Sequence, residues 1–164
     1  MIRVAIKGCN LDFVTINPLI VPNIIPNIKA IKDSSGELER IQAYAKIAKN
    51  KDFELLIGSD SKISYAYGLG ATAAVAGTSN VIVDTLVGLD KALNEGDTET
   101  AEKLQKDIDV LRGVLKLGTV PSAMKRSVEL AGIAEVGPAR MPVQELSKED
   151  DEKITEMLKY YGLK

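Results

Sequence analysis

The sequence predicts an α/β protein with a parallel sheet in its first half and helices in its second half. A short apolar strand, a small polar turn and a helical pattern follow one another three times between residues 28 and 94. Such alternation favours parallel strands joined by right-handed crossovers. After residue 96 the apolar spacing is helical. We therefore expect βα units in residues 1–96 and a helical extension packed on them in residues 97–164.

The first unit is a strand over residues 28–32 that ends on a lysine. Because side chains alternate along a strand, Lys32 is expected to share a face with two apolar residues and to be buried there. Ser34 and Glu37 have the spacing of a capping box, and the apolar spacing that follows predicts a helix to about residue 50.

The second and third units repeat this order. A strand over residues 53–57 leads into a polar turn at 58–61 and a helix to about residue 67. A strand of small apolar residues at 71–76, expected to be buried on both faces, leads into a turn at 77–80 and a helix. The remaining predicted elements are helices at 98–117, 121–131 and 148–161, an extended linker at 139–143, a strand at 1–6 and a proline-interrupted helix at 11–20.

The composition narrows the possible functions. The 164 residues suit one domain, and a formal net charge of -2 gives no electrostatic reason to expect a nucleic acid or a membrane as partner. The single Cys9 cannot form an internal disulfide, which favours a reducing, cytoplasmic location. Because histidine is absent, any chemistry must come from Lys, Asp, Glu, Tyr, Ser or Thr.

The carboxyl ends of parallel strands meet at one edge of a sheet, where α/β enzymes place their chemistry. An amine, a carboxylate, hydroxyls and glycines at that edge fit a small polar pocket. A lysine desolvated on an apolar face favours its neutral amine, which can attack a carbonyl carbon and form a Schiff base. The residues expected at this edge are Lys32, Ser34, Gly58, Asp60, Ser61 and Gly77.

Simpler explanations stay open for each of these features. Lysines near strand ends are mostly solvated surface residues. The turn at residues 58–61 could merely place Asp60 as the N-cap of its helix. A further alternative is a small open α/β domain that binds phosphate at its helix N-termini, although the sequence contains no P-loop or dinucleotide fingerprint.

The segment Ile-Lys-Ala-Ile-Lys-Asp-Ser-Ser-Gly at residues 28–36 resembles the Schiff-base lysine motif of the dihydrodipicolinate synthase / N-acetylneuraminate lyase family of aldolases. The likeness continues through the turns at 58–61 and 77–80 and through residues 121–132. It ends with residues 137–142, which are similar to the family's Arg-x-Pro segment. The Gly-Ser-Asp-Ser form of the second turn looks most like the 2-keto-3-deoxygluconate aldolase branch.

This resemblance implies the C-terminal three βα units of a (β/α)8 TIM barrel with a C-terminal helical extension, in a homo-oligomer. It implies a class I aldolase or lyase that acts on a pyruvate-type 2-oxo acid without metal or cofactor. Cleavage of 2-keto-3-deoxygluconate and synthesis of dihydrodipicolinate are both compatible with it. Lys32 would form the imine with the 2-oxo acid. The residues that would line the substrate site are Ser34, Gly58, Asp60, Ser61 and Gly77.

Two of the family's motifs have no counterpart in this chain. A tyrosine that carries protons should fall near Met1, and an earlier Gly-x-Thr-Gly-Glu type motif, which holds the substrate carboxylate, is absent. Since lost proton transfer costs roughly 10²–10⁴-fold in rate, we expect this truncated chain alone to be a poor catalyst. The alternative is a non-catalytic fragment, or a half-barrel that associates with another chain to cover its open strand edge.

Overall fold

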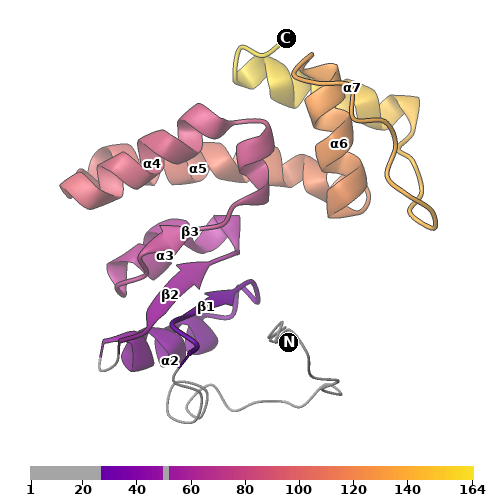
Figure 1. Ribbon diagram of the computed structural model, residues 1–164. Coiled ribbons are helices and arrows are strands. Elements are labelled where there is room, and N and C mark those ends of the chain that lie inside the picture. The colour runs from indigo at the N-terminus through magenta and orange to yellow at the C-terminus, as the bar shows by residue number, and fades with distance from the viewer. Residues whose placement is uncertain (1–26, 50–51) are drawn as a thin grey trace. The chain divides into compact units, whose positions relative to one another are not determined.

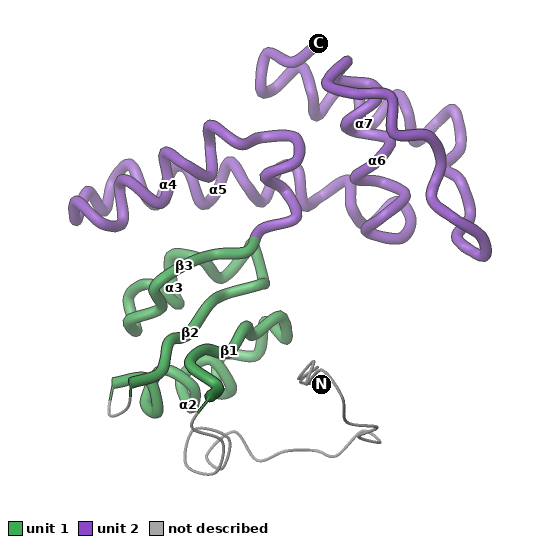
Figure 2. The backbone as a smooth tube through the Cα atoms, in the orientation of Figure 1, with its two compact units in different colours: residues 1–75 green, residues 76–164 purple. Residues whose placement is uncertain are grey.

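The computed structural model describes residues 27–49 and 52–164. The chain forms two compact units, residues 1–75 and residues 76–164 (Figure 2). The strand and the helix expected in residues 1–20 lie outside the described residues. The division expected at residue 96, which separates βα units from helices, stays a prediction.

The first unit contains a three-stranded parallel sheet in the order β1-β2-β3, as the sequence predicts. Its strands are β1 (Ala30–Asp33), β2 (Glu54–Ile57) and β3 (Ala73–Ala74), and its helices are α2 (Leu38–Ala48) and α3 (Ile63–Gly68). Helix α2 packs on β1 and β2 and also contacts α3 (Figure 1). The crossover through α2 brings the ends of β1 and β2 into register, with Asp33 opposite Ile57.

The core of this unit lies between one face of the sheet and α2. Ile31, Leu55 and Ile57 are buried from the strands, and Ile41 and Tyr44 are buried from the helix. This burial follows the alternation that the sequence predicts, because every second strand residue points toward the helix.

The opposite face of the sheet departs from the prediction. Ala30 and Lys32 are exposed, so the expected burial of Lys32 is wrong for this chain. Residues Ala73 and Ala74 of β3 are half-buried, not buried on both faces. The reason is the same in both places: within the described part of the first unit, the contacts of α2 cover one face of the sheet only.

Helix α2 begins differently from the prediction. Its N-cap is Glu37, which makes no side-chain cap bond, so the capping box predicted for Ser34 and Glu37 is wrong. The Ser35 hydroxyl instead binds the backbone at the start of α2. It accepts a hydrogen bond from Glu37 N–H at 3.1 Å and donates one to the Asp33 carboxylate at 3.1 Å. Gly36, at a φ of +73°, supplies the left-handed backbone that this turn requires.

The second unit is helical, as the sequence predicts. Helices α4 and α5 lie side by side, α6 packs on α7, and α7 also contacts α5 (Figure 1). Of the helices in the described ranges, none is long and apolar enough to span a membrane. The elements are the 3-10 turn η2 (Gly77–Asn80), α4 (Val83–Glu95), α5 (Thr98–Val114), η3 (Leu115–Leu117), α6 (Val120–Leu130) and α7 (Lys148–Tyr160).

Both ends of α7 are fastened. At its start, Ser147 and Asp150 form a reciprocal capping box, which confirms the N-cap and the first-turn acid expected there. At its end, the Tyr160 hydroxyl donates to Asp107 Oδ1 at 2.6 Å. The Tyr161 hydroxyl donates to the backbone carbonyl of Asp107 and accepts from Leu111 N–H at 3.1 Å. These bonds hold the end of α7 against α5.

We predict that the second unit loses stability at high pH through Tyr161. Burial is the first cause that raises the pKa of Tyr161 to about 12, above its ordinary value of 10.0. The unfolded chain therefore releases the phenolic proton before the folded chain does. The stabilisation is complete below pH 10.0 and is lost as the pH rises to about 12.

The measurement is denaturant unfolding of the protein and of Tyr161→Phe across this pH range. The difference in their free energies of unfolding should shrink as the pH rises, because the phenylalanine cannot ionise. A difference that stays constant from pH 10 to pH 12 would contradict this assignment.

Candidate functional site

The carboxyl ends of β1 and β2 bring three of the predicted site residues, Lys32, Ser34 and Gly58, together in the first unit. Lys32 pairs with Leu56 across the two strands, one position before the strands end. Immediately after the strands, Gly58 N–H donates a hydrogen bond of 2.6 Å to the Asp33 carbonyl. This bond joins the ends of the two strands and fixes the position of Lys32 relative to Gly58 along the strand direction.

Gly58 is the point at which three of the predicted residues meet. A Cβ atom at this position would overlap both Lys32 Cε and Ser34 Oγ, and it would lie 3.2 Å from the Asp33 carbonyl oxygen. The aliphatic chain of Lys32 therefore passes directly over the Gly58 backbone, and the Ser34 hydroxyl lies beside it. Glycine at position 58 leaves the space in which the lysine and the serine sit.

The two turns after β1 and β2 also touch each other. A Cβ on Gly36 would lie 3.2 Å from Ser59 Oγ, so the turn after β1 rests against the turn after β2. Within the first turn, the Asp33 carboxylate accepts from Ser35 N–H at 2.9 Å. The sequence prediction did not include Asp33, Ser35 or Ser59. The Asp-x-Ser spacing, which is typical of a local side-chain turn, was the signal that could have revealed the first two.

Asp60 and Ser61 follow at the start of a 3-10 turn, η1 (Asp60–Lys62). Asp60 is buried, with 5% of its surface exposed, and Ser61 is half-buried. The simple explanation that Asp60 is a helix N-cap is wrong, because Ser59 is the N-cap of η1 and Lys62 is the N-cap of α3.

Gly77 belongs to the second unit, where it begins the turn η2. Its expected role in lining the substrate site therefore stays a prediction. The structure brings together Lys32, Ser34 and Gly58, and it adds the turn residues that hold them.

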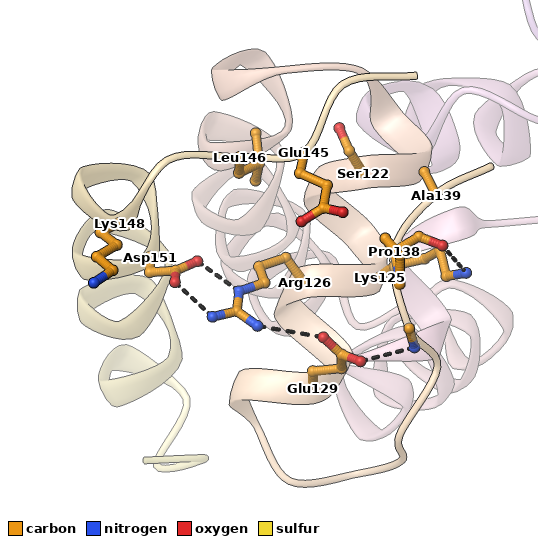
Figure 3. Close-up of a pocket in the computed structure, with 11 residues that line it drawn as sticks. Ser122, Lys125, Arg126, Glu129, Pro138, Ala139, Glu145, Leu146, Lys148 and Asp151 are labelled. Carbon is orange, nitrogen blue, oxygen red and sulfur yellow. Dashed lines mark hydrogen bonds and ion pairs between the residues drawn. The ribbon is translucent and has the colours of Figure 1, made fainter. Parts of the chain in front are cut away.

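A second feature, a cleft of about 300 Å³, opens in the second unit between α6, α7 and the segment that joins them (Figure 3). Arg126 lies in its wall with its guanidinium bound to both Asp151 oxygens, at 2.6 and 2.5 Å, and to Glu129 at 3.3 Å. The hydrogen bonds to Asp151 are the first cause of a raised pKa for Arg126.

The same wall fastens the joining segment to α6. Lys125 donates to the Pro138 carbonyl at 2.8 Å, and Glu129 accepts from Gly137 N–H at 2.8 Å (Figure 3). Lys125 and Glu129 are one helical turn apart on the same face of α6, so they can bind two consecutive residues of the segment. The sequence prediction missed these contacts and the Arg126–Asp151 pair, because the partners are 8 to 25 residues apart and share no local pattern. Most of the charged side chains that line the cleft form these hydrogen bonds and ion pairs, so we assign the cleft a structural role.

Residues 4–161 match the model of the dihydrodipicolinate synthetase family. The chain belongs to this family. The 4-hydroxy-tetrahydrodipicolinate synthase of Methanosphaerula palustris is 30% identical over 136 residues, which cover 83% of this chain and 46% of the relative. The enzyme of the same name from Thermoanaerobacter pseudethanolicus is 30% identical over 139 residues, 85% of this chain and 46% of the relative.

Solved structures of the family share the fold. Dihydrodipicolinate synthase from Aquifex aeolicus is 29% identical and has a TM-score of 0.78 over 88% of this chain and 49% of its own. The enzyme from Thermotoga maritima, at 23% identity, has a TM-score of 0.83 over 90% of this chain and 50% of its own. These likenesses confirm the predicted fold class, part of a (β/α)8 barrel with following helices. The chain spans about half the length of the curated relatives it matches.

We predict that Gly58→Ala displaces the exposed Lys32 and Ser34 side chains and destabilises the first unit by about 1 kcal/mol, because the methyl group lies 3.2 Å from the Asp33 carbonyl oxygen. Gly68→Ala is the matched control, since a Cβ there has no atom within 4 Å and lies in helix α3. The control should be neutral or stabilising, by up to about 1 kcal/mol. Denaturant unfolding measures both, and equal stability of the two variants would refute the close approach.

We predict that Asp151→Asn loosens α7 from α6 and costs about 1 kcal/mol, since its bidentate pair with Arg126 is only partly exposed. Glu149→Gln removes an exposed pair with Lys153 on the same helix and should cost no more than about 0.5 kcal/mol. The comparison is made by thermal unfolding at low salt. A larger loss for Glu149→Gln would show that the Arg126–Asp151 pair is not what stabilises this helix pair.

Proposed function

We propose that this chain carries the imine-forming centre of a class I aldolase or lyase that acts on a pyruvate-type 2-oxo acid. One observation carries the proposal: the Lys32 side chain lies exposed over Gly58 and beside the Ser34 hydroxyl. An amine is thus held at the carboxyl edge of a parallel sheet, on the face that α2 does not cover. Membership of the dihydrodipicolinate synthetase family supports the same role for this lysine.

The chemistry follows from the properties of an amine. The Lys32 nitrogen attacks the 2-oxo carbon of the acid, the carbon–oxygen bond breaks, and water leaves. The resulting protonated imine withdraws electrons from the neighbouring carbon. A carbon–carbon bond to that neighbour can then break, with the electron pair moving toward the imine nitrogen, or form in the reverse direction. The step needs no metal and no redox cofactor.

The remaining substrate contacts are proposed on position. Ser34 and Gly58 lie against the lysine, and Asp60 and Ser61 begin the turn that follows Gly58. Gly77 would join them from the third strand–turn–helix unit. The relatives are named for 4-hydroxy-tetrahydrodipicolinate synthesis, whereas the form of the 58–61 turn favours 2-keto-3-deoxygluconate cleavage. A homo-oligomer in the cytoplasm is the assembly and the location that we propose.

A second candidate is a non-catalytic half-barrel that associates with another chain. It is favoured by the exposed face of the sheet, where Ala30 and Lys32 are uncovered. The sheet order, in which β1 and β3 are the edges among the described strands, points the same way. Such edges and faces are normally covered. A monomer by light scattering that also unfolds in one sharp cooperative transition in denaturant would contradict this alternative.

We predict that borohydride in the presence of pyruvate traps a covalent adduct on Lys32, located by mass mapping of peptides. Lys32→Arg should abolish the adduct, because a guanidinium does not form the imine. Lys29→Arg is the matched control: Lys29 is three residues away, exposed, and paired with Asp52 at 2.6 Å. Its adduct should stay at the level of the unchanged protein.

Two outcomes would refute the catalytic proposal. One is the absence of any adduct on the folded protein. The other is equal labelling of Lys29 and Lys32, which would show only the general reactivity of exposed amines.

A further inference from the structure

We propose that Asp33 is a positioning residue for Lys32: its buried carboxylate holds the turn that fixes the path of the lysine. The inference rests on the proposed function, because it concerns how the imine-forming amine is presented. No contact between Asp33 and the substrate is involved.

The strand places the two side chains on opposite faces of the sheet. Lys32 is exposed on the open face, whereas Asp33 is 5% exposed on the face that packs against helix α2. A carboxylate on a buried face is costly unless hydrogen bonds compensate for the lost water. An apolar residue would serve packing alone at this position, so the hydrogen bonds of Asp33 indicate what it does.

Both carboxylate oxygens of Asp33 bind the turn that follows the lysine. Oδ1 accepts from Ser35 N–H at 2.9 Å, and Oδ2 accepts from the Ser35 hydroxyl at 3.1 Å. The same hydroxyl accepts from Glu37 N–H at 3.1 Å. This chain of bonds joins the end of β1 to the start of α2 and leaves the turn little freedom.

The backbone of Asp33 completes the arrangement. Its carbonyl accepts from Gly58 N–H at 2.6 Å, and Gly58 is the residue over which the Lys32 chain lies. The side chain of Asp33 thus fixes the turn after β1, while its backbone fixes β1 against the end of β2. Lys32, the preceding residue, is held between these two restraints.

Confinement of this kind matters for a lysine, because four rotatable bonds separate its amine from the backbone. The chain of Lys32 rests on Gly58 beside Ser34, so a shift of the strand end relative to Gly58 changes where the nitrogen lies. A displacement of about 1 Å in a reacting group can cost roughly 10²-fold in rate. A purely structural role for Asp33 would instead lower stability and leave the reactivity of the folded protein unchanged.

The test compares borohydride trapping of pyruvate by Asp33→Ala, Asp33→Asn and Ile41→Val, each at a temperature where it is fully folded. Asp33→Ala should lower the maximal trapping rate about 10- to 100-fold. Asp33→Asn keeps an oxygen that can accept from Ser35, and it should restore most of that rate. Ile41→Val removes one methylene group from the core that packs on the same sheet and leaves the turn unchanged. It should leave the rate unchanged.

Two results would overturn the inference. If Asp33→Ala reacts as fast as Ile41→Val, Asp33 is structural only. If Asp33→Asn is as slow as Asp33→Ala, the bonds to Ser35 are not what positions the lysine.

Amide hydrogen exchange keeps the inference testable if the unchanged protein traps no pyruvate and the proposed function fails. The amides of Ser35 and Gly58 should lose protection in Asp33→Ala. The amide of Glu54, bonded to the Lys29 carbonyl at the other end of the strand pair, should keep it. Equal protection of Ser35 and Gly58 in both proteins would overturn the positioning role.

Discussion

The hydrogen bond from Gly58 N–H to the Asp33 carbonyl is the contact on which the candidate site depends. It holds the carboxyl ends of β1 and β2 side by side, so the turns that follow the two strands meet. Glycine at position 58 then leaves room for Lys32 and Ser34 above its backbone. Without this pairing, the Lys32 amine and the Ser34 hydroxyl would not lie against the turn that follows β2. With it, they share one short edge of the sheet.

The two faces of the small sheet differ in their burial. One face buries Ile31, Leu55 and Ile57 against α2, and this apolar burial stabilises the first unit. The other face carries Lys32 in an exposed position. An exposed amine is open to a ligand, but it lacks the desolvation that a closed barrel gives to its interior. The same exposure therefore supports both the imine-forming proposal and the alternative of a half-barrel that binds another chain.

The second unit is held by polar contacts between helices as well as by its apolar core. Tyr160 and Tyr161 fasten the end of α7 to α5, and Arg126 fastens the beginning of α7 to α6. The clasp formed by Lys125 and Glu129 then fixes Gly137 and Pro138 against α6. Helices that are held at both ends have little freedom to slide.

The sequence by itself determined the order and type of the elements, the parallel sheet and the family, because apolar periodicity, turn residues and a local lysine motif are properties of neighbouring residues. It also predicted that Lys32, Ser34 and Gly58 lie together, since the carboxyl ends of parallel strands meet at one edge. Only the tertiary structure decided that Lys32 is exposed, that Ser35 and not Ser34 serves the start of α2, and that Asp33 binds both the turn and Gly58. The physical reason is that burial and hydrogen-bond choice depend on what packs against each residue, and those partners lie on other strands and helices.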